Sequence, residues 1–452
     1  MTISAFRIKN FMAFEDSGWV PIKPITLLFG QNSSGKSSIL KALMFLKQST
    51  GAQRLTLVSE YGVDLGSYTN IVHGLSKTAY LKSKKRLSFG FKVPISLNLL
   101  HNTDFASQTA TLNIDFGWNP NKKAPDIVAF EITLLPDDIT IDEYYFKVEI
   151  EDYSDTDANS NLIFETNIFD DKTKINKTDI WEKIQLKTIY GFMPLLDIAQ
   201  KEESDEKSKD WEFVNRILIQ LRRDIREFLE TILYVKPVRP DPERLFVINN
   251  LKQEELKRQG FSSFLKFLNQ GYANAQQENA LDTWAQHLGL GQKIRVKKYS
   301  NIPGSSIISE VVVTSLSGQI VNLADIGFGV SQVLPVLIEC LFSESGATVL
   351  VQQPELHLHP AAQAELGDLF ITSLADMSKT YILETHSEHL VLRLQRRVRN
   401  TLISQDSISV NYIARDKKKS TCIHIRMNNK GEFIDEWPNG FFEEGYREVF
   451  GN

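Results

Sequence analysis

The segment from Gly30 to Ser37, GQNSSGKS, has the residue types and spacing of a phosphate-binding loop. It matches the pattern GxxxxGK[ST] at every fixed position. In such loops the backbone N–H groups and the N-terminus of the next helix point at one anion, the lysine reaches the β- and γ-phosphates, and the last hydroxyl takes a Mg²⁺ position. We expect these roles for Lys36 and Ser37. The expected nucleotide-binding residues are Gly30, Asn32, Ser33, Ser34, Gly35, Lys36, Ser37 and Ser38.

The segments on both sides of this loop suit that role. Residues 24–29 are an apolar run typical of a buried strand, and residues 38–46 have the pattern of a helix. A chance turn rich in glycine and serine would need neither element. The sequence therefore predicts that the chain binds a nucleoside triphosphate, with ATP and Mg²⁺ as the expected ligands.

Two later apolar runs, residues 347–351 and 381–384, predict buried strands that end in polar turns. In P-loop ATPases a strand of this kind ends in an acidic residue that supports Mg²⁺, and a second acid can activate water. A histidine in such a turn can hydrogen-bond the γ-phosphate or the attacking water. The candidate catalytic residues are Gln353, Glu355, Glu384 and His386, and Gln352 is the candidate metal position beside Ser37.

These assignments have structural alternatives. Glu355 could be a turn residue ahead of a helix at 361–374, and His386 taken alone could be a hydrogen-bonded structural histidine. His357, His359, His386 and His389 could form a metal cluster. The HxH and HxxH spacings are common by chance, however, and no cysteine lies beside them, so zinc is the weaker interpretation.

Residues 322–332, NLADIGFGVSQ, predict a glycine-rich turn that opens a helix. The plain interpretation is a loop with a serine cap. The alternative is a second anion site, in which Ser331 meets the nucleotide of another subunit. The position just before the 347–351 strand favours the alternative.

The composition bounds the class of protein. The chain has 452 residues, of which 42% are hydrophobic and 24% charged, and its net charge is −5, which argues against a strongly basic nucleic-acid coat. Two cysteines, Cys340 and Cys422, are too few for a disulfide framework, so we expect a reducing cytoplasmic location. No run of eighteen apolar residues predicts a membrane helix, and residues 1–8 predict a strand rather than a signal peptide.

The pattern along the chain predicts an α/β fold in which one nucleotide-binding parallel sheet is split in sequence. Strand and helix alternate in residues 1–84 and again in residues 291–452. Between them, residues 85–290 predict antiparallel strands followed by helices, the first of them at 211–232. Residues 151–161 are polar and rich in turn residues, and the charged run 201–210 predicts either a loop or the segment that leads into a helix.

The order of these motifs resembles that of the ABC-type ATPases of the RecF/SMC/OLD superclass, and most of all its stand-alone bacterial members, which lack a long coiled coil. The motifs are the phosphate loop, GFGVSQ at 327–332, PELHLHP at 354–360 and ETHS at 384–387. Further segments that resemble this group are residues 63–68, 71–74, 234–244 and 436–442. The resemblance covers both halves of the head and is weak over residues 85–230.

This resemblance implies a split ABC-type P-loop head that forms a dimer around two ATP molecules. Each ATP would lie between the phosphate loop of one subunit and the Ser331 helix of the other, so that ATP controls assembly. Many relatives work in DNA repair or in bacterial defence against phage, often beside a separate nuclease.

Gln352 and Gln353 depart from the family pattern, because relatives often have acids at these positions. A neutral amide is a poorer partner for Mg²⁺ than a carboxylate and cannot take a proton from water. It can orient an attacking water, as glutamine does in some GTPases. We therefore expect slow hydrolysis and a long-lived ATP-bound state, which suits a switch or sensor better than a motor.

We expect a homodimer or higher oligomer that acts as a scaffold or sensor for a separate effector, a nuclease or toxin, in antiphage defence. The alternatives are a RecF-like DNA-repair ATPase that clamps DNA and a scaffold that binds ATP without hydrolysing it. No Toprim motif follows His386 and no apolar heptads persist, so we expect neither a nuclease nor a long tether in this chain.

Three basic features have open roles. Arg239 and Arg244 lie among prolines, either as solvated loop residues or as positive groups near phosphate or at the dimer contact. The run RDKKK at 415–419 predicts a solvated hairpin tip, with a nucleic-acid contact as the less favoured alternative.

Overall fold

A computed structural model describes most of the chain. The described residues are 3–52, 54–58, 63–75, 85–95, 108–119, 122–135, 144–150, 162–166, 184–189, 192–198, 207–237, 239, 241–258, 261–272, 274–299, 307–416 and 419–438. The polar segment 151–161, residues 201–206 of the charged run and residues 439–442 of the last family-like segment lie outside these ranges. The rest of the charged run, residues 207–210, is helical, in agreement with the helix alternative. None of the described helices is long and apolar enough to cross a membrane.

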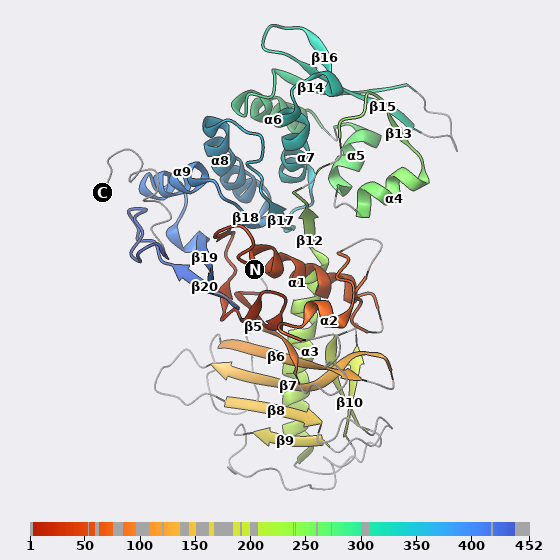
Figure 1. Cartoon of the computed structure of the whole chain (residues 1–452), viewed down its shortest axis with the longest axis vertical. Coiled ribbons are helices and arrows are strands. Elements are labelled where there is room, and N and C mark those ends of the chain that lie inside the picture. Colours follow the sequence, from red (N-terminus) through yellow and green to blue (C-terminus); the bar gives the residue numbers. More distant parts are fainter. Residues whose placement is uncertain are drawn as a thin grey trace.

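A six-stranded sheet forms the centre of the molecule (Figure 1). Its first five strands are mutually parallel, and the last is antiparallel to its neighbour. The middle strands are buried along their whole length, which explains their continuous apolar sequence. In order across the sheet they are β12 (Ile232–Val235), β17 (Thr348–Gln352), β18 (Thr380–Glu384), β4 (Ile25–Phe29), β19 (Ile408–Asp416) and β20 (Lys419–Ile425).

The register of this sheet brings three turns to one edge. Gln352 lies opposite Glu384, and Glu384 lies opposite Leu28 on β4. The segments that follow β17, β18 and β4 therefore begin side by side at the carboxyl ends of parallel strands, where ligands of open α/β sheets bind.

Helices cover both faces of the central sheet, and the sheet separates two apolar cores. One core contains Leu43 and Ile217, and the other contains Val333 and Leu366. The helices are α1 (Lys36–Ser49), α3 (Lys207–Glu230), α7 (Phe328–Phe342), α8 (Pro360–Met377) and α9 (Glu388–Arg399), with the short elements α2 (Tyr68–Ile71), η3 (Leu323–Asp325) and η4 (Gln405–Ser407).

A second, antiparallel sheet lies below α1 in Figure 1. Phe89 and Phe91 of its strand β5 face the core, where they pack with Phe6 and Phe45. The prediction of antiparallel strands in this region is confirmed. The strands are β2 (Phe14–Asp16), β1 (Ala5–Phe11), β5 (Leu87–Ile95), β6 (Gln108–Asn119), β7 (Ala124–Leu135), β8 (Tyr144–Ile150) and β9 (Leu162–Thr166), and β3 (Val20–Pro21) pairs with β1.

A third sheet and three helices form the upper lobe of Figure 1. The sheet consists of β13 (Phe246–Ile248), β15 (Ile307–Thr314), β14 (Lys293–Lys298) and β16 (Ile320–Asn322). The helices are α4 (Asn250–Arg258), α5 (Ser262–Gln270) and α6 (Ala275–His287). Outside this lobe, the strands β10 (Ile184–Ile189) and β11 (Met193–Ile198) form a separate hairpin, and β11 contacts α3.

The mixed α/β architecture is confirmed, but two groups of strands cross the predicted boundaries. β1 to β3, placed in the first head segment, belong to the antiparallel sheet, and β12, placed in the insertion, is the edge strand of the central sheet. The predicted helix 211–232 was wrong at its end, since Ile232 begins β12 after α3 ends at Glu230. Ile232 is apolar at helical spacing, yet strand pairing with β17 outweighs that pattern. The three-segment division itself stays a prediction.

Candidate functional site

The P-loop, Gly30–Ser37, joins β4 to α1 as predicted. Gly30 has φ +142°, and a Cβ built there would lie 2.3 Å from the carbonyl oxygen of Ile413. Gly35 has φ +107°, and its Cβ would lie 2.7 Å from that of Ala13. Both positions therefore require glycine, for conformation and for space.

Lys36 is folded back onto the P-loop. Its Nζ donates to the carbonyl oxygens of Gly30 and Gln31, at 2.8 Å each, and the residue is 3% exposed. Burial lowers the pKa of Lys36, while the nearby carboxylates of Glu384 and Glu355 act in the opposite direction. A buried ammonium held by neutral carbonyls has strong affinity for an arriving anion, because no direct carboxylate partner neutralises it.

A chain of hydrogen bonds connects Ser37 to three strands of the central sheet. Ser37 Oγ donates to Glu384 Oε1 at 2.9 Å, and Gln352 Nε2 donates to Glu384 Oε2 at 2.5 Å. Tyr234 on β12 completes the chain by donating its hydroxyl to Gln352 Oε1 at 2.6 Å. The acidic group beside the Ser37 hydroxyl is thus Glu384 of β18, and Gln352 acts as its hydrogen-bond donor.

The turn after β17 is held against the end of β18. Gln353 has φ +46°, and its backbone N–H donates to the carbonyl of Glu384 at 2.7 Å. Glu355 is 8% exposed, its Oε1 accepts from the backbone N–H of His386 at 2.7 Å, and burial raises its pKa. Burial, together with the charge of Lys36, lowers the pKa of His386, which keeps the imidazole neutral near pH 7.

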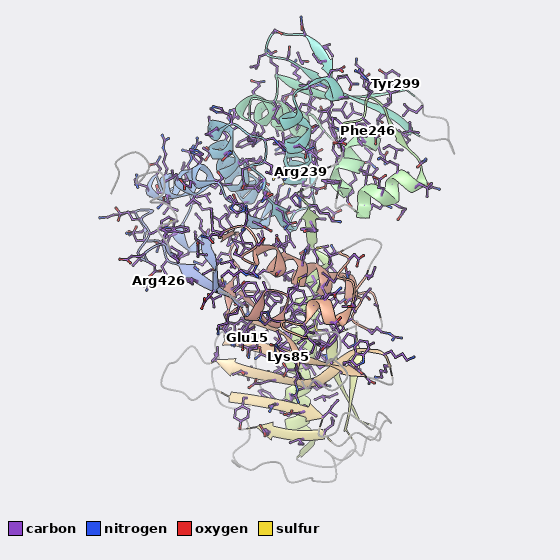
Figure 2. The ribbon with its side chains drawn as sticks, in the orientation of Figure 1. Glu15, Lys85, Arg239, Phe246, Tyr299 and Arg426 are labelled. Atoms are coloured by element: carbon purple, nitrogen blue, oxygen red, sulfur yellow. The ribbon has the colours of Figure 1, made fainter. Side chains whose placement is uncertain are left out.

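Arg239 lies in this site and Arg244 does not. Arg239 is 3% exposed, and its Nη2 donates to the backbone carbonyls of Gln352 and Gln353 at 3.0 Å each (Figure 2). Burial lowers its pKa to about 10, partly offset by Glu355. Arg244 is exposed and forms a bidentate ion pair with Asp325. The interpretation as a solvated loop residue therefore fits Arg244 but not Arg239, and a position of Arg239 near phosphate or at a dimer contact stays a prediction.

The start of α7 packs on the β17 turn of the same chain. A Cβ at Gly329 would lie 2.7 Å from the carbonyl oxygen of His357. Beside this contact lies a groove of about 400 Å³, whose lining includes Leu288, Leu290, Gly327, Gly329, His357 and His359. Ser331 is only 4% exposed, so its neighbours would have to move before its side chain touched another subunit. Its role in trans stays a prediction.

The remaining candidate residues lie at the starts of helices and in the P-loop. Among the described residues, no three His, Cys, Asp or Glu side chains are grouped as metal ligands, so the histidines form no such cluster there. His359 instead caps α8, and Ser387 caps α9 by accepting from the N–H of Leu390 at 3.1 Å. In the P-loop, Asn32 and Ser33 are exposed, whereas Ser34 and Ser38 are buried.

Sequence reasoning missed Tyr234 as a site residue. It lies 118 positions from the glutamine that it contacts, on a strand whose position in the sheet no local pattern specifies. The available signal was the family-like segment 234–244, which begins at this tyrosine and contains Arg239.

These groups fit Mg²⁺–ATP. The loop N–H groups and Lys36 would hold the phosphates, and Ser37 with Glu384 would hold Mg²⁺, which neutralises charge on the transferred phosphoryl group when bound. The fit rests on the buried amine of Lys36 and on the Ser37 hydroxyl already bonded to a carboxylate.

Residues 1–391 match the model of the AAA ATPase domain family (AAA_15). The chain belongs to this family. The match includes the P-loop, Arg239 and both polar turns of the site, and it confirms the resemblance to ABC-type ATPases of the RecF/SMC/OLD superclass that the sequence motifs indicate. Residues 403–450 match a second family, described as protein of unknown function (DUF3696). A search of the curated proteins finds no match.

Solved structures similar to this AAA-family chain include SMC head domains. One is the SMC head domain from Thermotoga maritima, with 9% identity, a TM-score of 0.38, and coverage of 94% of this chain and 100% of that one. Another is an Smc head with an extended coiled coil, bound to the C-terminal domain of ScpA derived from Pyrococcus furiosus, with 12% identity, a TM-score of 0.36, and coverage of 94% and 96%. At TM-scores below 0.5 these similarities carry no inference about function.

Proposed function

We propose that this AAA-family chain binds Mg²⁺–ATP at the P-loop, hydrolyses it slowly, and acts as a dimeric or larger scaffold or sensor. The observation that carries the proposal is the chain Ser37–Glu384–Gln352, which joins the P-loop hydroxyl to a single carboxylate and an amide. A carboxylate next to Ser37 supports metal-dependent phosphate chemistry. The amides at 352 and 353 leave no acid at the end of β17.

The residues have distinct roles in this proposal. Lys36 neutralises phosphate charge, and Glu384 with Ser37 holds the metal. Gln353 orients the attacking water but cannot take its proton, so that step falls to Glu355 or to the phosphate itself. Glu355 is bonded to the N–H of His386 and its pKa is raised, which makes it a better base than an ordinary carboxylate. His386, neutral, can donate a hydrogen bond near the phosphate.

Steady-state ATP turnover tests this proposal. We expect the wild type to turn over below about one ATP per second, the low end of enzyme rates. Lys36→Ala should abolish nucleotide binding. Glu384→Gln should lower turnover at least about tenfold and raise the Mg²⁺ concentration that is required, because it removes the carboxylate at the metal. Glu388→Gln, four residues along at the start of α9, is the matched control.

Two results would contradict the proposal. Turnover of many ATP per second that is unaffected by Gln353→Ala would exclude the slow, amide-oriented mechanism. Retained ATP with no turnover at all would instead support a scaffold that does not hydrolyse ATP, an alternative with which the two amides are also compatible.

We further propose that the chain controls a separate effector in antiphage defence, and this proposal rests on the family resemblance alone. The chain purified from its native cells should carry a nuclease or toxin subunit, identified by mass spectrometry. Turnover that rises on addition of duplex DNA, with no partner protein present, would favour the DNA-repair alternative.

A further inference from the structure

The hairpin made by β19 and β20 contacts the P-loop directly. Arg415 Nη1 donates to the backbone carbonyl of Ser33 at 2.6 Å. Ser420 Oγ donates to the carbonyl of Ser34 at 2.5 Å and is itself buried. The hairpin belongs to the segment that matches the second family, outside the match to the AAA ATPase domain.

The hairpin is fixed to the nucleotide-binding half at several points. β19 pairs in parallel with β4, the strand that leads into the P-loop. The N–H of Ser420 donates to the carbonyl of Ala13 at 3.0 Å, and a Cβ at Gly35 would lie 3.1 Å from Ser420 Oγ. Ile413 also closes the space beside Gly30. The P-loop is therefore enclosed by the hairpin on one side.

These contacts matter for anion binding because a phosphate-binding loop must present its N–H groups and keep its carbonyl groups turned away. Carbonyl oxygens that turned inward would repel the phosphate. In this chain the carbonyls of Ser33 and Ser34 have hydrogen-bond donors on the hairpin. Among the residues that the structure describes, Lys36 is the only side-chain donor to the carbonyls of Gly30 and Gln31, and it must leave them to reach a phosphate.

We propose that the β19–β20 hairpin is part of the nucleotide site and that Arg415 and Ser420 are positioning residues, which hold the P-loop in its anion-binding conformation. The inference rests on the proposed ATP binding and assigns β19 and β20, part of the 403–450 segment, a place in it. It also gives a specific role to the first residue of the basic run at 415–419. Because the two residues act on the loop and not on the reacting atoms, they set nucleotide affinity and leave the rate of the bound complex unchanged.

Nucleotide affinity of the full chain tests the proposal, measured by titration with a fluorescent ATP analogue. We expect Ser420→Ala to weaken binding about fivefold, the effect of one neutral hydrogen bond. Arg415→Ala should weaken it about tenfold, because the lost bond is charge-assisted, and Arg415→Lys should recover part of the loss. The turnover number at saturating ATP should stay within about twofold of the wild type in all three variants.

Two matched controls lie near the hairpin. Thr421→Ala changes the exposed residue next to Ser420. Arg426→Ala breaks an exposed ion pair with Asp435 after β20 (Figure 2). Both should bind nucleotide like the wild type. The rise in melting temperature on adding ATP, measured for each protein from its own value without nucleotide, should be smaller in the Ser420 and Arg415 variants than in the wild type and the two controls.

The outcomes separate the two proposals. If Lys36→Ala abolishes binding while Ser420→Ala and Arg415→Ala bind like the wild type, the role of the hairpin is wrong and the ATP site stands. If Lys36→Ala binds nucleotide like the wild type, the proposed ATP binding at the P-loop is wrong, and the proposed role of the hairpin is wrong with it. If the Ser420 and Arg415 variants lose turnover number but not affinity, the residues act in catalysis and the positioning role is overturned.

Discussion

Glu384 and Gln352 lie side by side at the ends of neighbouring strands, and their hydrogen bonds fix each other's orientation. Tyr234 donates to the amide oxygen of Gln352, so the amide nitrogen must face Glu384. That donation occupies one carboxylate oxygen and leaves the other directed at Ser37. Gln352 thus orients the Glu384 carboxylate of the neighbouring strand by donating a hydrogen bond to it. An ionised acid at position 352 would instead repel that carboxylate.

The sequence identified most of these residues but not their partners. Gln352, Glu384 and Ser37 follow buried strands or a fixed motif, and such patterns are local. The sequence assigned a metal position to Gln352 and a catalytic role to Glu384, whereas the contacts bring the Glu384 carboxylate, and not the Gln352 amide, to the Ser37 hydroxyl. The sequence could not show this, because the register between β17 and β18 is set by packing across the sheet. The assignments of Gln352 and Glu384 both remain predictions until metal binding is measured.

Arg239 is predicted to stabilise the site turn. Arg239→Ala removes the donor to two backbone carbonyls, those of Gln352 and Gln353, and should lower the free energy of unfolding by about 1–3 kcal/mol. Arg244→Ala breaks an exposed ion pair and should lower it by less than about 1 kcal/mol. Urea denaturation of both variants measures the difference. Equal losses would show that Arg239 is not anchored as described.

At the scale of elements, the buried contact between α5, α7 and β18 holds a carboxyl group that the nucleotide chemistry does not use. Glu339 of α7 is fully buried, and its Oε1 accepts from the N–H of Ser263 at 3.0 Å. Lys379, just before β18, donates to the carbonyl of Cys340 at 2.6 Å. Burial raises the pKa of Glu339 to about 7 and lowers that of Lys379 to about 8.

This contact predicts a pH dependence of stability. Glu339 has a pKa above its usual value of 4.5 in the folded state, so its contribution is fully present below pH 4.5 and is lost as the pH rises to about 7. Between pH 4.5 and 7.5 the wild type should therefore lose stability relative to Glu339→Gln, by up to about 3 kcal/mol at about 1.4 kcal/mol per pKa unit. Lys379 titrates above this window and has the opposite sign.

Urea denaturation at pH 5 and pH 7.5 measures this difference. Glu344→Gln is the matched control, since that side chain is 85% exposed and lies just beyond α7. The control should keep a constant difference from the wild type across the two pH values. A constant difference for Glu339→Gln as well would mean that Glu339 titrates normally in the folded protein.

Some elements could be predicted from local sequence patterns, whereas the positions of others depend on packing between distant segments. Strands β4, β17 and β18 could be predicted because each contains a run of mostly apolar residues, and α8 and α9 because apolar residues recur at helical spacing. The place of β12 at the sheet edge could not, since a four-residue strand after a long helix has no periodicity of its own. The contact of Arg415 with the P-loop could not be predicted either, because it joins residues 382 positions apart.

For the whole molecule, the arrangement of α7 bears on assembly. The start of α7 packs on the β17 turn, beside a groove of about 400 Å³, and Gly327 in the lining of this groove has open space around it. In the proposed dimer, a second copy of the chain would lie on this face, with ATP between the copies. The buried Ser331 indicates that such a contact begins with the exposed rim of the helix start and not with the serine side chain.

The dimer is therefore predicted to depend on ATP and on space at Gly327. With Mg²⁺–ATP, the mass measured by light scattering should rise from that of one chain to that of two, and Gly327→Arg should prevent the rise while leaving the nucleotide affinity of the single chain unchanged. Gly51→Arg adds the same bulk at another exposed glycine with nothing within 4 Å, and should still form the dimer. A mass that is indifferent to ATP, or a Gly327→Arg variant that dimerises like the control, would place the subunit contact elsewhere on the molecule.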